Sequence, residues 1–128
     1  MSGKLCSDLA CRVWVLGDSY LGLTSPARFP YYILKCGFEH WLACGYPGAG
    51  ALSQLQSFEN LLTLSSPDYA VWCLGMNNGD KGDTINEQWL ECTRKFLLLC
   101  EQNDIVPIIS TIPTTWKPND DGTHTVVV

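Results

Sequence analysis

The chain has 128 residues, of which 46% are apolar and 16% are charged. This length suits one packed domain spanning residues 1–128, and the high apolar content excludes a disordered chain or a long coiled coil. The sequence has 13 acidic and 8 basic side chains, so its formal net charge is −5. Nucleic acid and anionic membrane surfaces are therefore not expected as partners.

Sequence signals for export, membrane insertion and disulfide bonding are weak. The segment Met1–Arg12 has no apolar run of signal-peptide length, and no apolar run of about 18 residues occurs anywhere in the chain. Seven cysteines are scattered without CxxC spacing, and several of them stand inside apolar runs. We therefore expect a cytoplasmic protein with reduced, buried thiols, rather than a disulfide framework or a zinc site.

Four short apolar runs, each closed by Gly, Pro or a polar turn, predict strands. They are rich in Val, Ile and Trp and are apolar on both faces, which is typical of strands buried within a parallel sheet. The four predicted strands are Arg12–Leu16, Glu39–Ala43, Tyr69–Leu74 and Ile105–Ile112.

Segments with helical periodicity alternate with these runs. Apolar residues recur at helical spacing in Ala49–Leu64, which predicts a helix there. A second helix is predicted over Ile85–Asn103, where Thr84 and Glu87 have the form of a capping box. The segment Tyr20–Cys36 is interrupted by two prolines, so we expect a broken helix in it.

Alternation of strands and helices predicts an α/β fold. Right-handed crossovers then give a parallel sheet covered on both faces, a three-layer α/β/α, flavodoxin-like arrangement. An α+β domain with antiparallel pairing fits the same pattern less well. In a parallel sheet of this kind, ligands bind outside the carboxyl ends of the strands.

Three loops with polar or glycine residues are expected at that edge. Ser19 follows the first strand directly, where its hydroxyl could serve as a nucleophile or could simply cap a helix. Gly48 and Gly50 follow the second strand, and a backbone N–H there could approach an oxyanion or only form a turn. Asn77 follows the third strand, where its side chain could bind the same oxyanion or close an Asx-turn. The convergence of all three groups favours acyl transfer.

The same residues resemble the conserved blocks of the GDSL, or SGNH, hydrolases. Val13–Ser19 resembles their first block, and Leu74–Asn78 resembles their GxND block with Asn in place of the final Asp. Gly48 precedes Asn77 by 29 residues, a spacing typical of the family. The resemblance implies a serine esterase that needs no metal or cofactor. Ser19 would be the nucleophile, and its backbone N–H would form the oxyanion hole with Gly48 N–H and the Asn77 side chain.

A catalytic base is also implied by the resemblance. Asp121–His124 has the form of the family's Asp-x-x-His block, in which His124 would take the serine proton while Asp121 orients it. The other histidine, His40, stands at the start of a predicted strand, roughly 16 Å from the catalytic edge. His124 follows the predicted end of the fourth strand by twelve residues, so it can reach that edge.

The chain departs from the family pattern after its fourth strand. The stretch that usually separates this strand from the Asp-x-x-His block is nearly absent, and so is the helix that follows the block. We therefore expect a fold without its last strand and helix. The fourth strand then becomes an edge that could pair with the Val-rich tail or form a homo-oligomer.

The sequence thus predicts a serine esterase acting on a small acyl ester, such as an acetyl group on a carbohydrate, because the chain has no room for a lid. The alternative is a non-catalytic or truncated SGNH-like domain that lacks a working Asp-His pair. A flavodoxin-like nucleotide binder fits less well, because no phosphate-binding loop follows the first strand.

Overall fold

A computed structural model describes residues 10–18, 21, 35–75, 87–111 and 115–127. Its largest element is a four-stranded sheet in the order β2-β1-β3-β4, with every neighbouring pair parallel. The strands are β1 (Arg12–Gly17), β2 (His40–Ala43), β3 (Tyr69–Cys73) and β4 (Val106–Ile109). The predicted strands and the predicted α/β class are therefore confirmed.

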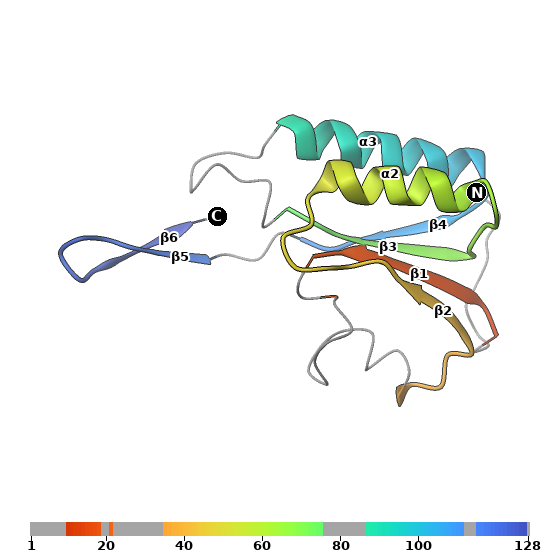
Figure 1. Ribbon diagram of the computed structural model, residues 1–128, viewed down its shortest axis with the longest axis horizontal. Coiled ribbons are helices and arrows are strands. Elements are labelled where there is room, and N and C mark those ends of the chain that lie inside the picture. Colours follow the sequence, from red (N-terminus) through yellow and green to blue (C-terminus); the bar gives the residue numbers. More distant parts are fainter. Residues whose placement is uncertain (1–9, 19–20, 22–34, 76–86, 112–114, 128) are drawn as a thin grey trace.

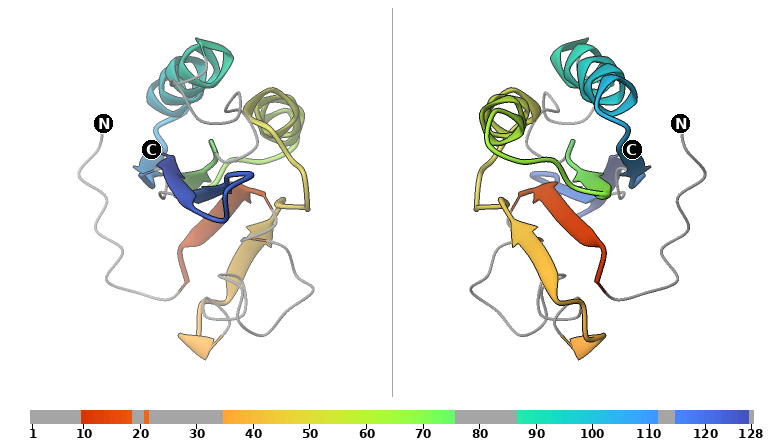
Figure 2. Two further views of the ribbon diagram at one scale, coloured as in Figure 1. Left: turned by 90° about the vertical axis from the view of Figure 1, so that its left-hand side faces the viewer. Right: turned by 90° about the vertical axis from the view of Figure 1, so that its right-hand side faces the viewer.

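Two helices lie side by side on one face of this sheet (Figures 1 and 2). They are α2 (Ala51–Leu62) and α3 (Glu87–Gln102), which match the two predicted helices within a few residues at each end. The predicted cap residue Thr84 lies outside the described residues, as does most of the predicted broken helix at 20–36. The described part therefore contains two of the three predicted layers.

Alternation along β1 divides the core between the two faces of the sheet. Trp14 and Leu16 point toward the helices, whereas Val13 and Val15 pack on the opposite face with Leu21. On the helix side, ring centroids of Phe96 and Trp72 lie 4.6 Å apart in a stacked arrangement, and those of Phe96 and Phe58 lie 5.1 Å apart. Alternate side chains of β1 therefore enter an aromatic cluster on one face of the sheet and a smaller aliphatic cluster on the other.

The prediction that all four strands are buried on both faces is wrong for the outer two. Only β1 and β3 have mostly buried residues, whereas every residue of β2 and β4 is either half-buried or exposed. Leu42 on β2 is 37% exposed and Ile108 on β4 is 47% exposed. Each outer strand has one neighbouring strand in the described part of the sheet, so its far side is less covered.

A hairpin follows β4 and projects beyond the sheet (Figure 1). It consists of β5 (Thr115–Pro118) and β6 (His124–Val127), which pair antiparallel as a separate two-stranded sheet. The suggested pairing of the Val-rich tail with the fourth strand is therefore wrong, because the tail pairs with β5. Homo-oligomerisation through the outer edge of β4 stays a prediction.

Five of the described cysteines are free thiols, as expected from the sequence. Cys92 and Cys100 are buried and Cys44 and Cys73 are partly buried, while Cys36 is exposed. Burial raises the pKa of the Cys100 thiol to about 12, so this thiol is unreactive at neutral pH. Cys11 is disulfide-bonded, contrary to the expectation of reduced thiols. Within the described ranges, no helix is long and apolar enough to cross a membrane.

Candidate active site at the carboxyl edge of the sheet

The carboxyl ends of the parallel strands meet at one edge of the sheet, where the sequence analysis placed its three loops. Gly17 at the end of β1 is in register with Cys73 at the end of β3. The chain leaves β1 toward β2 on one side and returns to β3 on the other, so this edge is a topological switch point. Ser19 and Asn77 lie outside the described residues, and Asp18 and Gly75 are the described residues closest to them in the chain.

The turn that follows β1 folds back over the strand ends. The backbone N–H of Leu21 donates to the carbonyl of Asp18 at 3.0 Å, and both residues are nearly fully buried. A Cβ atom at Gly17 would lie 2.1 Å from Leu21 Cδ1, and one at Gly45 would lie 3.0 Å from the Asp18 carbonyl oxygen. Two glycines therefore let the turn on either side of Ser19 pack directly against β1 and the loop after β2.

The loop after β2 presents Gly48 at the surface. Gly48 has φ +81, a left-handed conformation that favours glycine, and a Cβ atom there would have no neighbour within 4 Å. Ala49 N–H donates to the Tyr46 carbonyl at 3.2 Å, which closes the turn around Gly48. Gly50, the other candidate, has extended backbone and is the N-cap of α2. Gly48 is therefore the candidate whose backbone a ligand can approach without a side chain in the way.

We expect Gly48→Ala to reduce the free energy of unfolding by about 1 kcal/mol, because alanine is strained at positive φ. No steric clash adds to this cost, since the surrounding space is open. Gly50→Ala is the matched control, because the φ of −105 at Gly50 suits any residue. Urea denaturation measures both variants, and equal losses of stability would contradict the prediction.

The loop after β3 is anchored by a helix side chain. The indole N–H of Trp89 on α3 donates to the carbonyl of Leu74 at 2.8 Å, three residues before Asn77. Thr93, one helical turn further on, accepts from the Trp72 indole at 3.0 Å and donates to the Trp89 carbonyl at 2.7 Å. These bonds fix the end of β3 and the start of its loop relative to α3.

A buried amide joins the ends of β1 and β2. Gln54 on α2 is fully buried, and its Oε1 accepts from Gly17 N–H at 3.0 Å. Its Nε2 donates to the Cys44 carbonyl at 3.1 Å. The sequence analysis missed this residue, although a glutamine within the buried stripe of Ala51, Leu55 and Phe58 was a visible signal.

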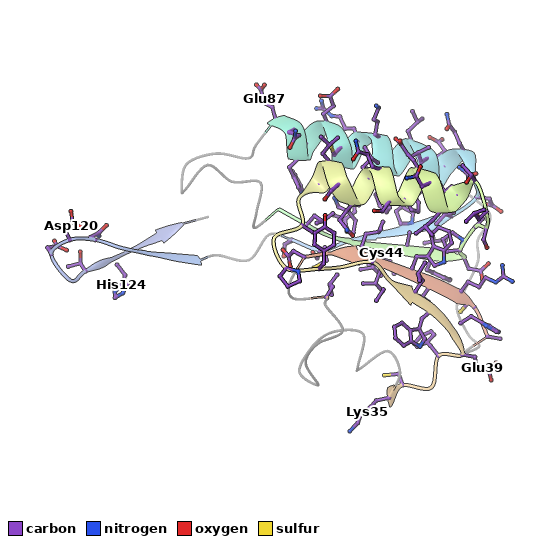
Figure 3. All side chains as sticks on the ribbon, viewed as in Figure 1. Lys35, Glu39, Cys44, Glu87, Asp120 and His124 are labelled. Carbon is purple, nitrogen blue, oxygen red and sulfur yellow. The ribbon has the colours of Figure 1, made fainter. Side chains whose placement is uncertain are left out.

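The predicted base and its partner lie on the hairpin. Asp121 occupies the turn between β5 and β6, where its carboxylate accepts from Thr123 N–H at 2.9 Å and from Thr123 Oγ1 at 2.5 Å. Figure 3 shows His124 on the hairpin, well apart from the sheet. His40 is in register with Arg12 at the amino ends of the strands, as expected from the sequence. The structure therefore places neither histidine at the carboxyl edge.

Hydrogen bonds from the Thr123 side chain and backbone lower the pKa of the Asp121 carboxyl group. Since the folded-state pKa lies below the unfolded one, this contribution to hairpin stability is present above the unfolded pKa. It is lost as the pH falls through the folded-state pKa. We expect Thr123→Val to raise the pKa of Asp121 part of the way back, because the backbone donor remains. An NMR titration of the Asp121 carboxyl carbon measures this, and an unchanged midpoint would contradict it.

Comparison of the sequence with protein-family profiles and with curated proteins gives no match. Comparison with solved structures does. A protein from Desulfitobacterium hafniense, described as lipolytic and of the G-D-S-L family, is 18% identical with a TM-score of 0.65, over 77% of this chain and 58% of that one. A GDSL-like lipase from Bacteroides thetaiotaomicron is 18% identical with a TM-score of 0.64, over 81% and 50%.

A third similar structure is the psychrotrophic esterase EstA from Pseudoalteromonas, inhibited by monoethylphosphonate. It is 16% identical with a TM-score of 0.62, over 79% of this chain and 59% of that one. The chain thus spans between 50% and 59% of the length of these three structural relatives. On this structural similarity, the chain with its four-stranded parallel sheet and two helices has the fold of the GDSL/SGNH hydrolases.

Proposed function

We propose that the protein is a serine esterase acting on short-chain esters. The observation that carries the proposal is the convergence of the loops after β1, β2 and β3 at one edge of a parallel sheet. In the sequence these loops carry Ser19, Gly48 and Asn77, and a hydroxyl with two oxyanion-binding N–H groups is the set needed for acyl transfer. Structural relatives named as esterases and lipases support the same reading.

In this proposal Ser19 Oγ attacks the ester carbonyl carbon while His124 takes the serine proton. The negative charge that develops on the carbonyl oxygen is held by Ser19 N–H, Gly48 N–H and the Asn77 side-chain amide. Collapse of the tetrahedral intermediate releases the alcohol, which receives its proton from His124. A water molecule, activated by the same histidine, then hydrolyses the acyl-enzyme and restores Ser19.

The hairpin must bring His124 to the carboxyl edge for this chemistry to occur. In the structure, His124 starts β6 and lies apart from the sheet (Figure 3). The chain between the end of β4 at Ile109 and His124 is long enough for His124 to reach that edge. Asp121 would then orient His124 through the carboxylate that Thr123 now holds in the turn.

A second candidate function is a non-catalytic domain that binds a small ester or acid through the same oxyanion-binding groups. The position of His124 on the projecting hairpin favours it, because a site without a base can bind but cannot turn over. The two candidates share the loops at the carboxyl edge and differ only in whether a histidine reaches them.

Hydrolysis of p-nitrophenyl acetate, butyrate and octanoate by the purified protein distinguishes the two functions. An esterase for short acyl chains should hydrolyse acetate fastest and octanoate slowest, and His124→Ala should lower kcat by several orders of magnitude. His40→Ala is the matched control, because His40 lies at the opposite end of the sheet. Equal rates for the wild type and His124→Ala would overturn the role of His124. No hydrolysis above the buffer rate would favour the binding domain.

A further inference from the structure

We infer that Gln54 is a positioning residue that sets the nucleophile turn against the loop of the oxyanion hole; this inference rests on the proposed function. The side chain of Gln54 is bonded to backbone groups at the ends of both β1 and β2. One of its partners, Gly17, precedes Ser19 by two residues in the chain, and the other, Cys44, precedes Gly48 by four. No assignment of catalytic groups includes it.

The side-chain amide of Gln54 takes the place of one backbone hydrogen bond between β1 and the residue after β2. Cys44 N–H donates to the Val15 carbonyl at 2.8 Å, a direct bond of the ladder between these two segments. In a regular parallel ladder the next bond would join Gly17 N–H to the Cys44 carbonyl. Instead, Gly17 N–H binds Oε1 of Gln54 and the Cys44 carbonyl binds Nε2, so a carboxamide group stands between them.

Insertion of this amide separates the two chains where they leave the sheet. Figure 3 labels Cys44 just beyond the end of β2, beneath α2 in this view. The gap is filled by the turn after β1, since Gly45 packs against Asp18 and Leu21 so closely that a Cβ atom would clash. The spacing between the turn that carries Ser19 and the loop that carries Gly48 therefore depends on the length and hydrogen bonding of one side chain.

Gln54 is fully buried, its bond to Gly17 is buried and its bond to the Cys44 carbonyl is partly buried, so both bonds are costly to lose. Replacing the amide by an apolar group of similar length leaves the Gly17 donor and the Cys44 acceptor without their partner. The strand ends would then rearrange, and a displacement of about 1 Å between reacting groups lowers the rate by about 100-fold. Binding of the ester would change much less, because the substrate does not touch Gln54.

The variant Gln54→Glu distinguishes a role of Gln54 in positioning the site from a role in the stability of the fold alone. When protonated, the introduced carboxyl group can accept from Gly17 N–H and donate to the Cys44 carbonyl, as the amide does. When ionised, it has no donor and faces the Cys44 carbonyl with a negative charge. Burial raises the pKa of such a group, so the variant should regain activity relative to the wild type as the pH falls toward 5.

The experiment measures kcat and KM for p-nitrophenyl acetate between about pH 5 and 9 for the wild type, Gln54→Glu, Gln54→Met and the control Gln56→Glu. Gln56 is exposed on the same helix and should leave both constants unchanged. We expect Gln54→Met to lower kcat by about 10- to 100-fold with KM within about threefold. The kcat of Gln54→Glu, divided by that of the wild type, should rise as the pH falls.

Thermal unfolding by circular dichroism is recorded for each variant, so that rates are compared per folded molecule. If Gln54→Met does not fold, the pH dependence of the Gln54→Glu rate is by itself the test of the positioning role. A pH-independent rate ratio for Gln54→Glu, or kcat values that follow only the folded fraction, would overturn the role of Gln54. A wild type that does not hydrolyse the ester at any pH would instead refute the proposed function.

Discussion

Ser19→Ala is expected to lower kcat/KM for p-nitrophenyl acetate by at least about 1,000-fold, because the variant loses the atom that attacks the ester carbonyl. The residual rate should remain above that of buffer, since Gly48 N–H and the Asn77 amide would still bind the oxyanion. The fold should tolerate the change, because an alanine fits wherever a serine does and the turn is held by the Leu21–Asp18 bond at 3.0 Å.

Ser66→Ala is the matched control for this experiment. Ser66 is an exposed serine between α2 and β3, at the amino end of the sheet and therefore remote from the three loops. Equal circular dichroism spectra for the two variants would show that both are folded. If Ser19→Ala retained the wild-type rate, Ser19 would not be the nucleophile, and hydrolysis would have to be assigned to another residue.

Phe96→Ala is expected to reduce the free energy of unfolding by about 3–5 kcal/mol. Phe96 is fully buried on α3, where it stacks on Trp72 with ring centroids 4.6 Å apart and packs against Phe58 at 5.1 Å. Its removal leaves a cavity between α3, α2 and β3 and also breaks two aromatic contacts. Because domains of this size are stable by only about 5–15 kcal/mol, the loss takes a large share of the total.

Leu98→Ala on the same helix is the control for the core. Leu98 is 51% exposed, so its truncation should cost much less than that of Phe96. Urea denaturation followed by tryptophan fluorescence measures both. Similar losses for the two variants would mean that the aromatic cluster is not the main source of stability.

The sheet and its helices could be predicted from the sequence because hydrophobic periodicity reports them directly. In β1, Trp14 and Val15 are both buried because β1 lies between two neighbours, and the continuous apolar run indicated this. The run in β4 looked the same, yet Ile108 is half-exposed. Whether a strand is central or at an edge depends on sheet order, which the apolar content of one run does not report.

The candidate site could be predicted only in part. Gly48 was identified from its place after a strand; its backbone has positive φ, and its role in an oxyanion hole stays a prediction. Asp121 and His124 were identified from a short pattern, which says nothing of the antiparallel hairpin that holds them. Gln54 was missed because its role depends on two backbone groups from separate strands, a contact that no local pattern encodes.

The central claim is that Ser19 is the nucleophile of an esterase site built on this fold. Reaction with a p-nitrophenyl alkylphosphonate tests it most directly, because such reagents phosphonylate a serine that is activated for attack and release p-nitrophenol. Intact mass and peptide mapping should show one phosphonyl group on Ser19 in the wild type and none in Ser19→Ala. An unmodified wild-type protein, or the same adduct on another residue in both proteins, would contradict the claim.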